Sequence, residues 1–235
     1  WLAGCLASWP AGSRAKPAMV WRRRGSGGAA GLVVRLLLQL RCAAGVLGVA
    51  TEKVGFSERL LGSFADQTFG QAFGVLIGVG NGRLALELLK AWPQGVLFLV
   101  DPYIHLRRGY DRPENLQDDD QQRQYEHLRN VLADTPNVQG RFSFVREFSF
   151  AIPKVWREKE WGPDPKFIYV DGNPSYGAVR TDIHAWWPML ANGGVMGGSN
   201  YTTQGDGKAV GVRQAVDEFA AERGLRVFVT SDLVD

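Results

Sequence analysis

The sequence predicts an α/β fold: a three-layer sandwich in which a mostly parallel sheet carries helices on both faces. Three observations lead to this prediction. Short apolar runs alternate with longer segments of helical periodicity from residue 52 onward. Several of these apolar runs end at a glycine or an aspartate. Hydrophobic residues make up 45% of the 235 residues, which suits one domain with a sizeable core.

Six apolar runs are expected to be strands, at residues 73–77, 96–100, 142–145, 167–170, 195–198 and 225–229. The segments between and before them are expected to be helices, at residues 56–69, 84–92, 116–133, 175–190 and 208–223. Pro93 and Gly224 follow two of these helices as stop signals. Strands that alternate with helices form βαβ units and a parallel sheet. Ligands of such sheets bind outside the carboxyl ends of the strands.

The first 51 residues differ in charge from the remainder. No acidic residue precedes Glu52, while seven Lys and Arg residues do, so a net charge of +3 leaves −4 on residues 52–235. We therefore expect a basic leader at residues 1–51, disordered or used for targeting, and one domain at residues 52–235. An Arg-rich, acid-free leader is typical of organellar transit peptides. The alternatives are an amphipathic helix that caps the domain, or misread sequence upstream of a start at Met19.

Composition also argues against several partners. The apolar run at residues 32–50 contains Arg35 and Arg41, so no membrane span is expected. The mildly acidic domain lacks a basic stripe that could neutralise phosphates, so nucleic acid is not an expected partner. Both cysteines, Cys5 and Cys42, lie in the leader, so the domain is expected to hold neither a disulfide nor a Cys-ligated metal.

A glycine-rich loop and an acidic residue follow the first two expected strands. Gly78, Gly80 and Gly82 form a G-x-G-x-G loop, and Asp101 ends the next strand. Glycines allow a ligand to approach the backbone closely, and an acid at that strand end can accept the hydroxyls of a ribose. The pair indicates an adenosine-containing cofactor. The alternative is a simple glycine-rich connection, with Asp101 as a helix cap before Pro102.

The residue at position 83 separates two such cofactors. Dinucleotide-binding loops have a third glycine or alanine there, whereas this chain has Arg83. The loop therefore favours S-adenosyl-L-methionine over NAD, and it argues against an oxidoreductase.

Further motifs follow in order: Asp171 after a strand, Trp186-Trp187-Pro188 on a helix, and Gly197-Gly198-Ser199-Asn200-Tyr201. This order resembles a subfamily of class I S-adenosylmethionine-dependent methyltransferases. Its pattern is Asp, then His-Asp-Tyr, then Trp-Trp-Pro, then Gly-Gly-His-Asp-Tyr. The resemblance extends over residues 56–230 and implies a Rossmann-like fold and methyl transfer to oxygen of a small or medium-sized hydroxylated acceptor.

The resemblance also implies roles for individual residues. Gly78, Gly80 and Gly82 would line the methionine and ribose parts of the cofactor, and Asp101 would hold the ribose hydroxyls. The adenine would lie near Arg146 and Ser149. The acceptor would be surrounded by four side chains: Asp171, Tyr176, Asn200 and Tyr201.

The chain departs from this family pattern around the expected reaction centre. Leu76 stands where an acid is usual, Pro174-Ser175 replaces His-Asp, and Ser199-Asn200 replaces a second His-Asp. Related enzymes bind a divalent cation there, but Asp171 and Asn200 alone are too few ligands, so no metal is expected. The losses also leave an alternative open, a catalytically degenerate cofactor-binding protein of the same fold.

The resemblance further implies a seventh, antiparallel strand between the fifth and the sixth. Only six residues follow position 229, too few for a turn and a strand. We therefore expect the sheet to lack this final strand. Unpaired strand edges invite association with other chains, so a homo-oligomer is a possible assembly.

Overall fold

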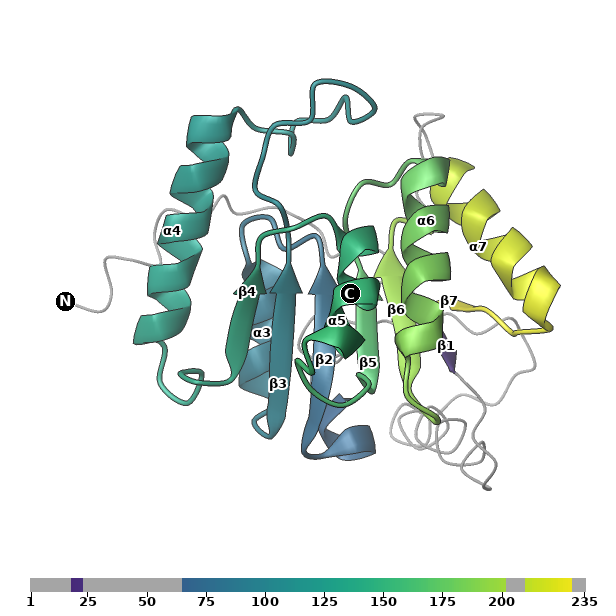
Figure 1. Ribbon diagram of the computed structural model, residues 1–235, viewed down its shortest axis with the longest axis horizontal. Coiled ribbons are helices and arrows are strands. Elements are labelled where there is room, and N and C mark those ends of the chain that lie inside the picture. The colour runs from purple at the N-terminus through teal and green to yellow at the C-terminus, as the bar shows by residue number, and fades with distance from the viewer. Residues whose placement is uncertain (1–17, 23–64, 202–209, 230–235) are drawn as a thin grey trace, which may run out of the picture.

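The computed structural model describes residues 18–22, 65–201 and 210–229. They form a seven-stranded sheet in the order β4-β3-β2-β5-β6-β1-β7 (Figure 1). The strands are β1 (Ala18–Arg22), β2 (Ala72–Ile77), β3 (Gly95–Val100), β4 (Phe142–Val145), β5 (Phe167–Val170), β6 (Val195–Ser199) and β7 (Phe228–Val229). The helices are α3 (Arg83–Ala91), α4 (Asp118–Asp134), α5 (Ile152–Glu158), α6 (Tyr176–Trp186) and α7 (Val210–Arg223), with 3-10 turns η1 (Ser149–Ala151) and η2 (Trp187–Met189).

The strands from β2 to β6 pair in parallel, as expected. β2 lies between β3 and β5, β3 also pairs with β4, and β5 also pairs with β6. All four residues of β5 are buried, which is typical of a strand covered on both faces. The predicted α/β class is therefore confirmed.

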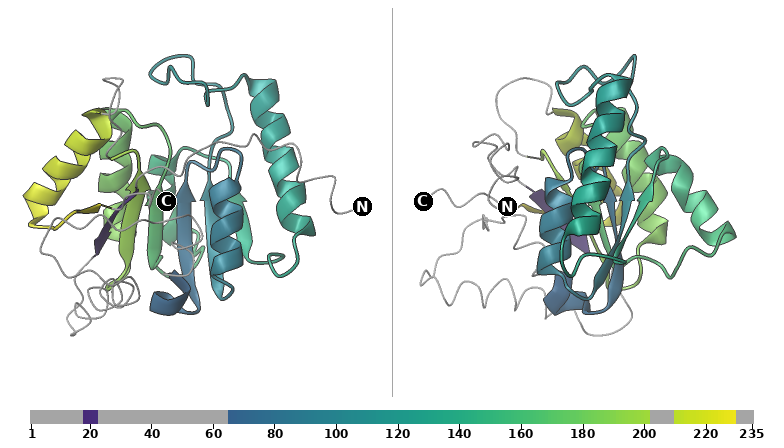
Figure 2. Two further views of the ribbon diagram at one scale, coloured as in Figure 1. Left: turned by 180° about the vertical axis from the view of Figure 1, so that it is seen from behind. Right: turned by 90° about the vertical axis from the view of Figure 1, so that its left-hand side faces the viewer.

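The helices cover both faces of the sheet, α3 and α4 on one and α5, α6 and α7 on the other (Figure 2). Successive residues of a strand point to opposite faces. Accordingly Leu76 of β2 packs in the cluster with α3 and α4, while its neighbours Val75 and Ile77 pack in the cluster with α5, α6 and α7. The parallel strands are thus anchored on both sides, which fixes where their carboxyl ends lie.

The seventh strand is present, and the expectation that it is missing was wrong. β1 lies antiparallel between β6 and β7, with Val20 opposite both Gly197 and Phe228. These five residues come from the segment that we expected to be a leader, so the predicted boundary at residue 52 does not hold for them. The remainder of residues 1–51 lies outside the described residues, as does most of the helix expected at 56–69, of which residues 65–69 are helical.

Within the described residues, no helix is both long enough and apolar enough to cross a membrane.

Candidate functional site

A cleft of about 810 Å³ opens at the carboxyl ends of the parallel strands, at the arrowheads in Figure 1. Its lining includes the glycine loop after β2, Asp101 after β3, and Asp171 after β5. Ser199 and Asn200 at the end of β6 complete the strand-end side. A cleft of this size at this edge of a parallel sheet is where a small ligand is expected to bind.

The three glycines of the loop have different local reasons. All have positive φ, at 78° for Gly78, 52° for Gly80 and 76° for Gly82. A Cβ at Gly78 would lie 2.5 Å from the backbone of Asp171 and Gly172, so the loop passes close to the end of β5. A Cβ at Gly80 would meet only Gln124 Nε2, at 3.9 Å. Gly78 and Gly80 line the cleft as predicted, and the room at Gly80 is available to a ligand.

Gly82 does not line the cleft, which corrects its predicted role. A Cβ there would lie 2.1 Å from Leu128 Cδ1 of α4. The glycine therefore allows the start of α3 to pack closely against α4.

Asp101 braces the glycine loop. Its Oδ2 accepts hydrogen bonds from the backbone N–H groups of Val79 at 2.9 Å and Gly80 at 3.1 Å, and its Oδ1 accepts one from Tyr103 N at 2.9 Å. The Tyr103 hydroxyl donates to Gly80 O at 3.0 Å, and burial raises the pKa of Tyr103, so that hydroxyl stays protonated. Asp101 is thus both a structural acceptor and a cleft-lining carboxylate.

A directed hydrogen-bond chain lies at the β5 and β6 end of the cleft. Asn200 Nδ2 donates to Ser199 Oγ at 3.0 Å, and Ser199 Oγ donates to Asp171 Oδ1, because an ionised carboxylate can only accept. Ser199 and Asn200 are 5% and 8% exposed. Asn200 has a φ of 63°, a conformation that asparagine tolerates better than most residues. The structure therefore brings Asp171 and Asn200 together, as predicted, with Ser199 between them.

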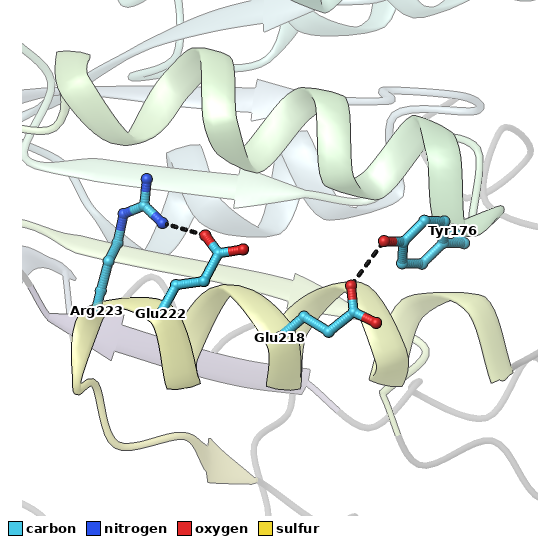
Figure 3. A network of polar contacts seen from close by, with 4 residues as sticks. All are labelled: Tyr176, Glu218, Glu222 and Arg223. Atoms are coloured by element: carbon cyan, nitrogen blue, oxygen red, sulfur yellow. Dashed lines mark hydrogen bonds and ion pairs between the residues drawn. The ribbon is translucent and has the colours of Figure 1, made fainter.

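Tyr176 and Tyr201 do not join that group, which corrects their predicted role. The Tyr176 hydroxyl donates to Glu218 Oε2 of α7 at 2.6 Å (Figure 3), and the Tyr201 hydroxyl donates to Asp217 Oδ1 at 2.6 Å. The hydrogen bond to Glu218 raises the pKa of Tyr176, and burial raises that of Tyr201 to about 12. Neither residue lines the cleft, and both hydroxyls fasten α7 to the strand-end loops.

The two residues expected near adenine also separate. The exposed Arg146 lies with its guanidinium carbon 4.6 Å from the centre of the Tyr125 ring and does not line the cleft. Ser149 does line it, and its hydroxyl donates to Asp182 Oδ1. The predicted position near the cleft therefore holds for Ser149 and not for Arg146.

Sequence reasoning missed Asp182, an acid on the inner face of α6. It is 6% exposed and lines the cleft, and burial raises its pKa from 3.8 to about 6. Val179, Ile183 and Trp186 lie on the same helix face and are buried. An acid at a position of the apolar stripe was the available signal, because such residues are almost never buried without a partner.

The loop between β3 and α4 reaches over the cleft and was also missed. Asn115 holds it: its Oδ1 accepts from Leu106 N at 2.8 Å, and its Nδ2 donates to Leu106 O and Tyr110 O, both at 2.8 Å. Asn173 Nδ2 donates to Gly109 O at 3.0 Å, which ties the loop to the end of β5. Tyr110 lines the cleft, and burial raises its pKa to about 12. The loop has no periodic pattern, so the sequence gave no sign of its path.

In the part of the chain that the structure describes, no three His, Cys, Asp or Glu side chains are grouped so that they could hold a metal ion.

Comparisons with known proteins agree with this architecture. A family model described as a methyltransferase domain matches residues 75–201. An O-methyltransferase from Bacillus cereus, solved in complex with SAH, is 14% identical with a TM-score of 0.51, covering 81% of this chain and 79% of that one. A putative caffeoyl-CoA O-methyltransferase from Staphylococcus aureus is 8% identical with a TM-score of 0.51, covering 87% and 93%. The search of curated protein sequences finds no match.

Proposed function

The chain belongs to the family of methyltransferase domains whose model matches residues 75–201, and from this premise we propose that it transfers a methyl group from S-adenosyl-L-methionine to an oxygen of a small or medium-sized hydroxylated acceptor. One observation supports this most: a single cleft joins the Asp101-braced glycine loop to the chain Asn200–Ser199–Asp171.

The residues present fit this cofactor. The cleft volume of about 810 Å³ is within the range of roughly 300–1,000 Å³ that is usual for small-molecule sites. Gly78 and Gly80 would lie along the methionine part, where the backbone leaves room, and Asp101 would accept hydrogen bonds from the ribose hydroxyls. Ser149 would lie toward the adenine. When bound, the cofactor supplies an electrophilic methyl group on sulfur.

The reaction needs an acceptor oxygen in line with that methyl group. Asp171 is suited to accept the proton of the acceptor hydroxyl while the oxygen forms its bond to carbon and the carbon–sulfur bond breaks. Ser199 holds Asp171 Oδ1, and Asn200 in turn holds Ser199, so the carboxylate is oriented before the acceptor arrives. The remainder of the rate enhancement would come from positioning the two reactants.

The finer parts of the proposal have separate supports. Oxygen as the accepting atom comes from the family resemblance, and the two solved relatives of similar fold are named as O-methyltransferases. A small acceptor, rather than a nucleic acid, is supported by the mixed charge of the cleft, which carries Arg83, Arg112 and Glu114 beside its aspartates.

A second candidate is a cofactor-binding protein that has lost catalysis. The observation that favours it is the orientation of Tyr176 and Tyr201, whose hydroxyls bind α7 and so leave fewer polar groups at the reaction end.

Two measurements test the proposal. Calorimetric titration with S-adenosylmethionine, S-adenosylhomocysteine and NAD should show binding of the first two alone. Transfer of a labelled methyl group to a panel of phenols, catechols and other alcohols should then fall by roughly 10²–10⁴-fold in Asp171→Ala, the usual contribution of a general base. Cofactor binding without transfer to any acceptor would support the second candidate, and binding of NAD alone would overturn both.

A further inference from the structure

Asp182 is a buried acid for which the proposed transfer has no use. Within the described residues its only side-chain hydrogen bond is the one from Ser149 Oγ to Oδ1. Oδ2 is not sealed off, because the one buried side-chain atom without a partner in the described residues is Asp66 Oδ1. Since Asp182 lines the cleft, Oδ2 faces it as an available acceptor.

The surroundings of this acceptor are apolar and flat. Among the described residues, the exposed large hydrophobic side chains are Ile104, Phe148 and Phe150, at 39%, 37% and 54% exposure, and all three line the cleft. Phe148 and Phe150 flank Ser149 in the sequence, and their rings stack with centroids 5.7 Å apart and planes 23° apart. Flat apolar walls around one anionic acceptor suit a planar heteroaromatic ring that carries an N–H donor.

The strand order gives this part of the cleft its place relative to the rest. Asp101 follows β3, which lies between β4 and β2, and Asp171 follows β5 on the far side of β2. Ser149 follows β4 and reaches α6, where Asp182 lies. A nucleoside with its ribose at Asp101 and its reacting end at Asp171 therefore extends its base toward Ser149 and Asp182.

We propose, on the basis of the function proposed above, that Asp182 accepts a hydrogen bond from the exocyclic amine of the cofactor's adenine. Asp182 is then the residue that selects an adenine over a 6-oxo purine. Ser149 is its positioning residue, because the hydroxyl holds Oδ1 and leaves Oδ2 toward the base. The Trp186 indole N–H donates to Ser149 O at 3.1 Å and fixes η1 against α6.

The competing explanation is purely structural: Asp182 would only tie η1 to α6. Both explanations predict that a substitution lowers stability. They differ in base preference, because a structural tie has no reason to distinguish an amine from a carbonyl at the purine 6-position. The informative quantity is therefore the ratio of two affinities measured on the same protein, which does not depend on how stable that protein is.

Calorimetric titration should compare S-adenosylhomocysteine with S-inosylhomocysteine, which carries a carbonyl in place of the amine. The wild-type protein should prefer the adenosyl compound by roughly 10–100-fold, the range for a hydrogen bond to a charged group. Asp182→Asn should lower that preference at least about fivefold, because an amide can also donate to the carbonyl. Ser149→Ala, a milder change, should lower it in the same direction.

Thr181→Val is the matched control. Thr181 is the preceding residue of α6 and lines the cleft, but its hydroxyl donates to Gly177 O at 2.7 Å within the helix. This variant should keep the wild-type preference. Tight binding of S-adenosylhomocysteine with an unchanged ratio in both Asp182→Asn and Ser149→Ala would overturn the role of Asp182 and leave the proposed function standing. Binding of neither compound to the wild-type protein would overturn the proposed function and this inference with it.

Discussion

Among single residues, Asp101 combines two roles that a sequence pattern cannot separate. Its carboxylate accepts three backbone N–H bonds, from Val79, Gly80 and Tyr103, and also lines the cleft. Asp101→Ala should therefore weaken S-adenosylhomocysteine binding by roughly 10–100-fold and also lower the melting temperature. Asp101→Asn keeps one acceptor oxygen and should lose less of both. Asn81→Ala, an exposed change in the same loop, serves as the control. A folded Asp101→Ala protein with unchanged affinity would exclude Asp101 from cofactor binding.

The buried carboxyl of Asp182 should make stability depend on pH. Burial raises its pKa from 3.8 in the unfolded chain to about 6 in the folded one, so folding favours the protonated form. The stabilisation is complete below about pH 4 and is lost as pH rises through 6; a shift of that size corresponds to at most about 3 kcal/mol. Urea unfolding of the ligand-free protein at pH 4.5 and 7.5 should show this loss in the wild type and not in Asp182→Asn. Equal pH slopes in the two proteins would contradict the prediction.

The limits of prediction at this scale follow from what spacing encodes. Asp101, Asp171 and Asn200 were found because each follows a strand, and strand ends meet at one edge of a parallel sheet. Tyr176 and Tyr201 also follow strands, yet their hydroxyls bind Glu218 and Asp217 of α7. Those partners lie 42 and 16 residues further along the chain, so no local pattern could indicate which way the rings turn.

At the scale of helices and strands, the glycine loop offers a matched pair of substitutions. Gly82→Ala should destabilise the fold by roughly 1–3 kcal/mol, because the added methyl overlaps Leu128 and the backbone has positive φ. Gly80→Ala also meets positive φ but has open space, so it should cost stability less and cofactor affinity more. Chemical unfolding and calorimetric titration of both variants test this difference. A Gly82→Ala protein as stable as Gly80→Ala would show that α3 and α4 can move apart freely.

β1 should matter for stability, in contrast to the expectation that the leader is dispensable. It pairs over five residues with β6 and over two with β7. Deleting residues 1–24 removes it and exposes the edge of β6, so the melting temperature should fall and aggregation should rise. Deleting residues 1–17 keeps β1 and should leave both properties near those of the full chain. Equal melting temperatures for the two deletions would show that β1 adds nothing to the sheet.

Strands were predicted well where both faces are buried and poorly where pairing is distant. β4 and β5 match their expected bounds, since each is a short apolar run bounded by polar or turn residues. β1 was missed because five residues beside an Arg-rich run carry too weak a pattern, and its neighbours lie at the other end of the chain. α5 was missed because it has seven residues, with Pro153 in its first turn. That proline is compatible with a helix start but reads as a break.

For the molecule as a whole, the position of β1 also bears on the leader as a targeting signal. Removal of all 51 residues as a transit peptide would take β1 out of the sheet, so a processed form should retain Ala18–Arg22. Organellar targeting remains a prediction. Fusing residues 1–17 and residues 1–51 separately to a fluorescent protein would test it.

Catalysis by the intact protein should depend little on divalent metal. Asp171 is the one carboxylate in the chain Asn200–Ser199–Asp171, and hard cations prefer about six oxygen ligands with several carboxylates among them. Methyl transfer measured with excess EDTA should therefore stay within about twofold of the rate with added magnesium. Complete loss in EDTA, with recovery on adding magnesium, would require a metal in the reaction.

The antiparallel strand β1 also imposes an order of events during synthesis. It leaves the ribosome first, but Val20 pairs with Gly197 and Phe228, so both of its neighbours are among the last residues made. The five parallel strands can form βαβ units while translation continues, because each pairs within a shorter stretch of chain. β1 must wait, and contacts of such high sequence separation slow folding. Insertion of β1 is thus the step by which the nascent chain seals its sheet, after translation has delivered β7.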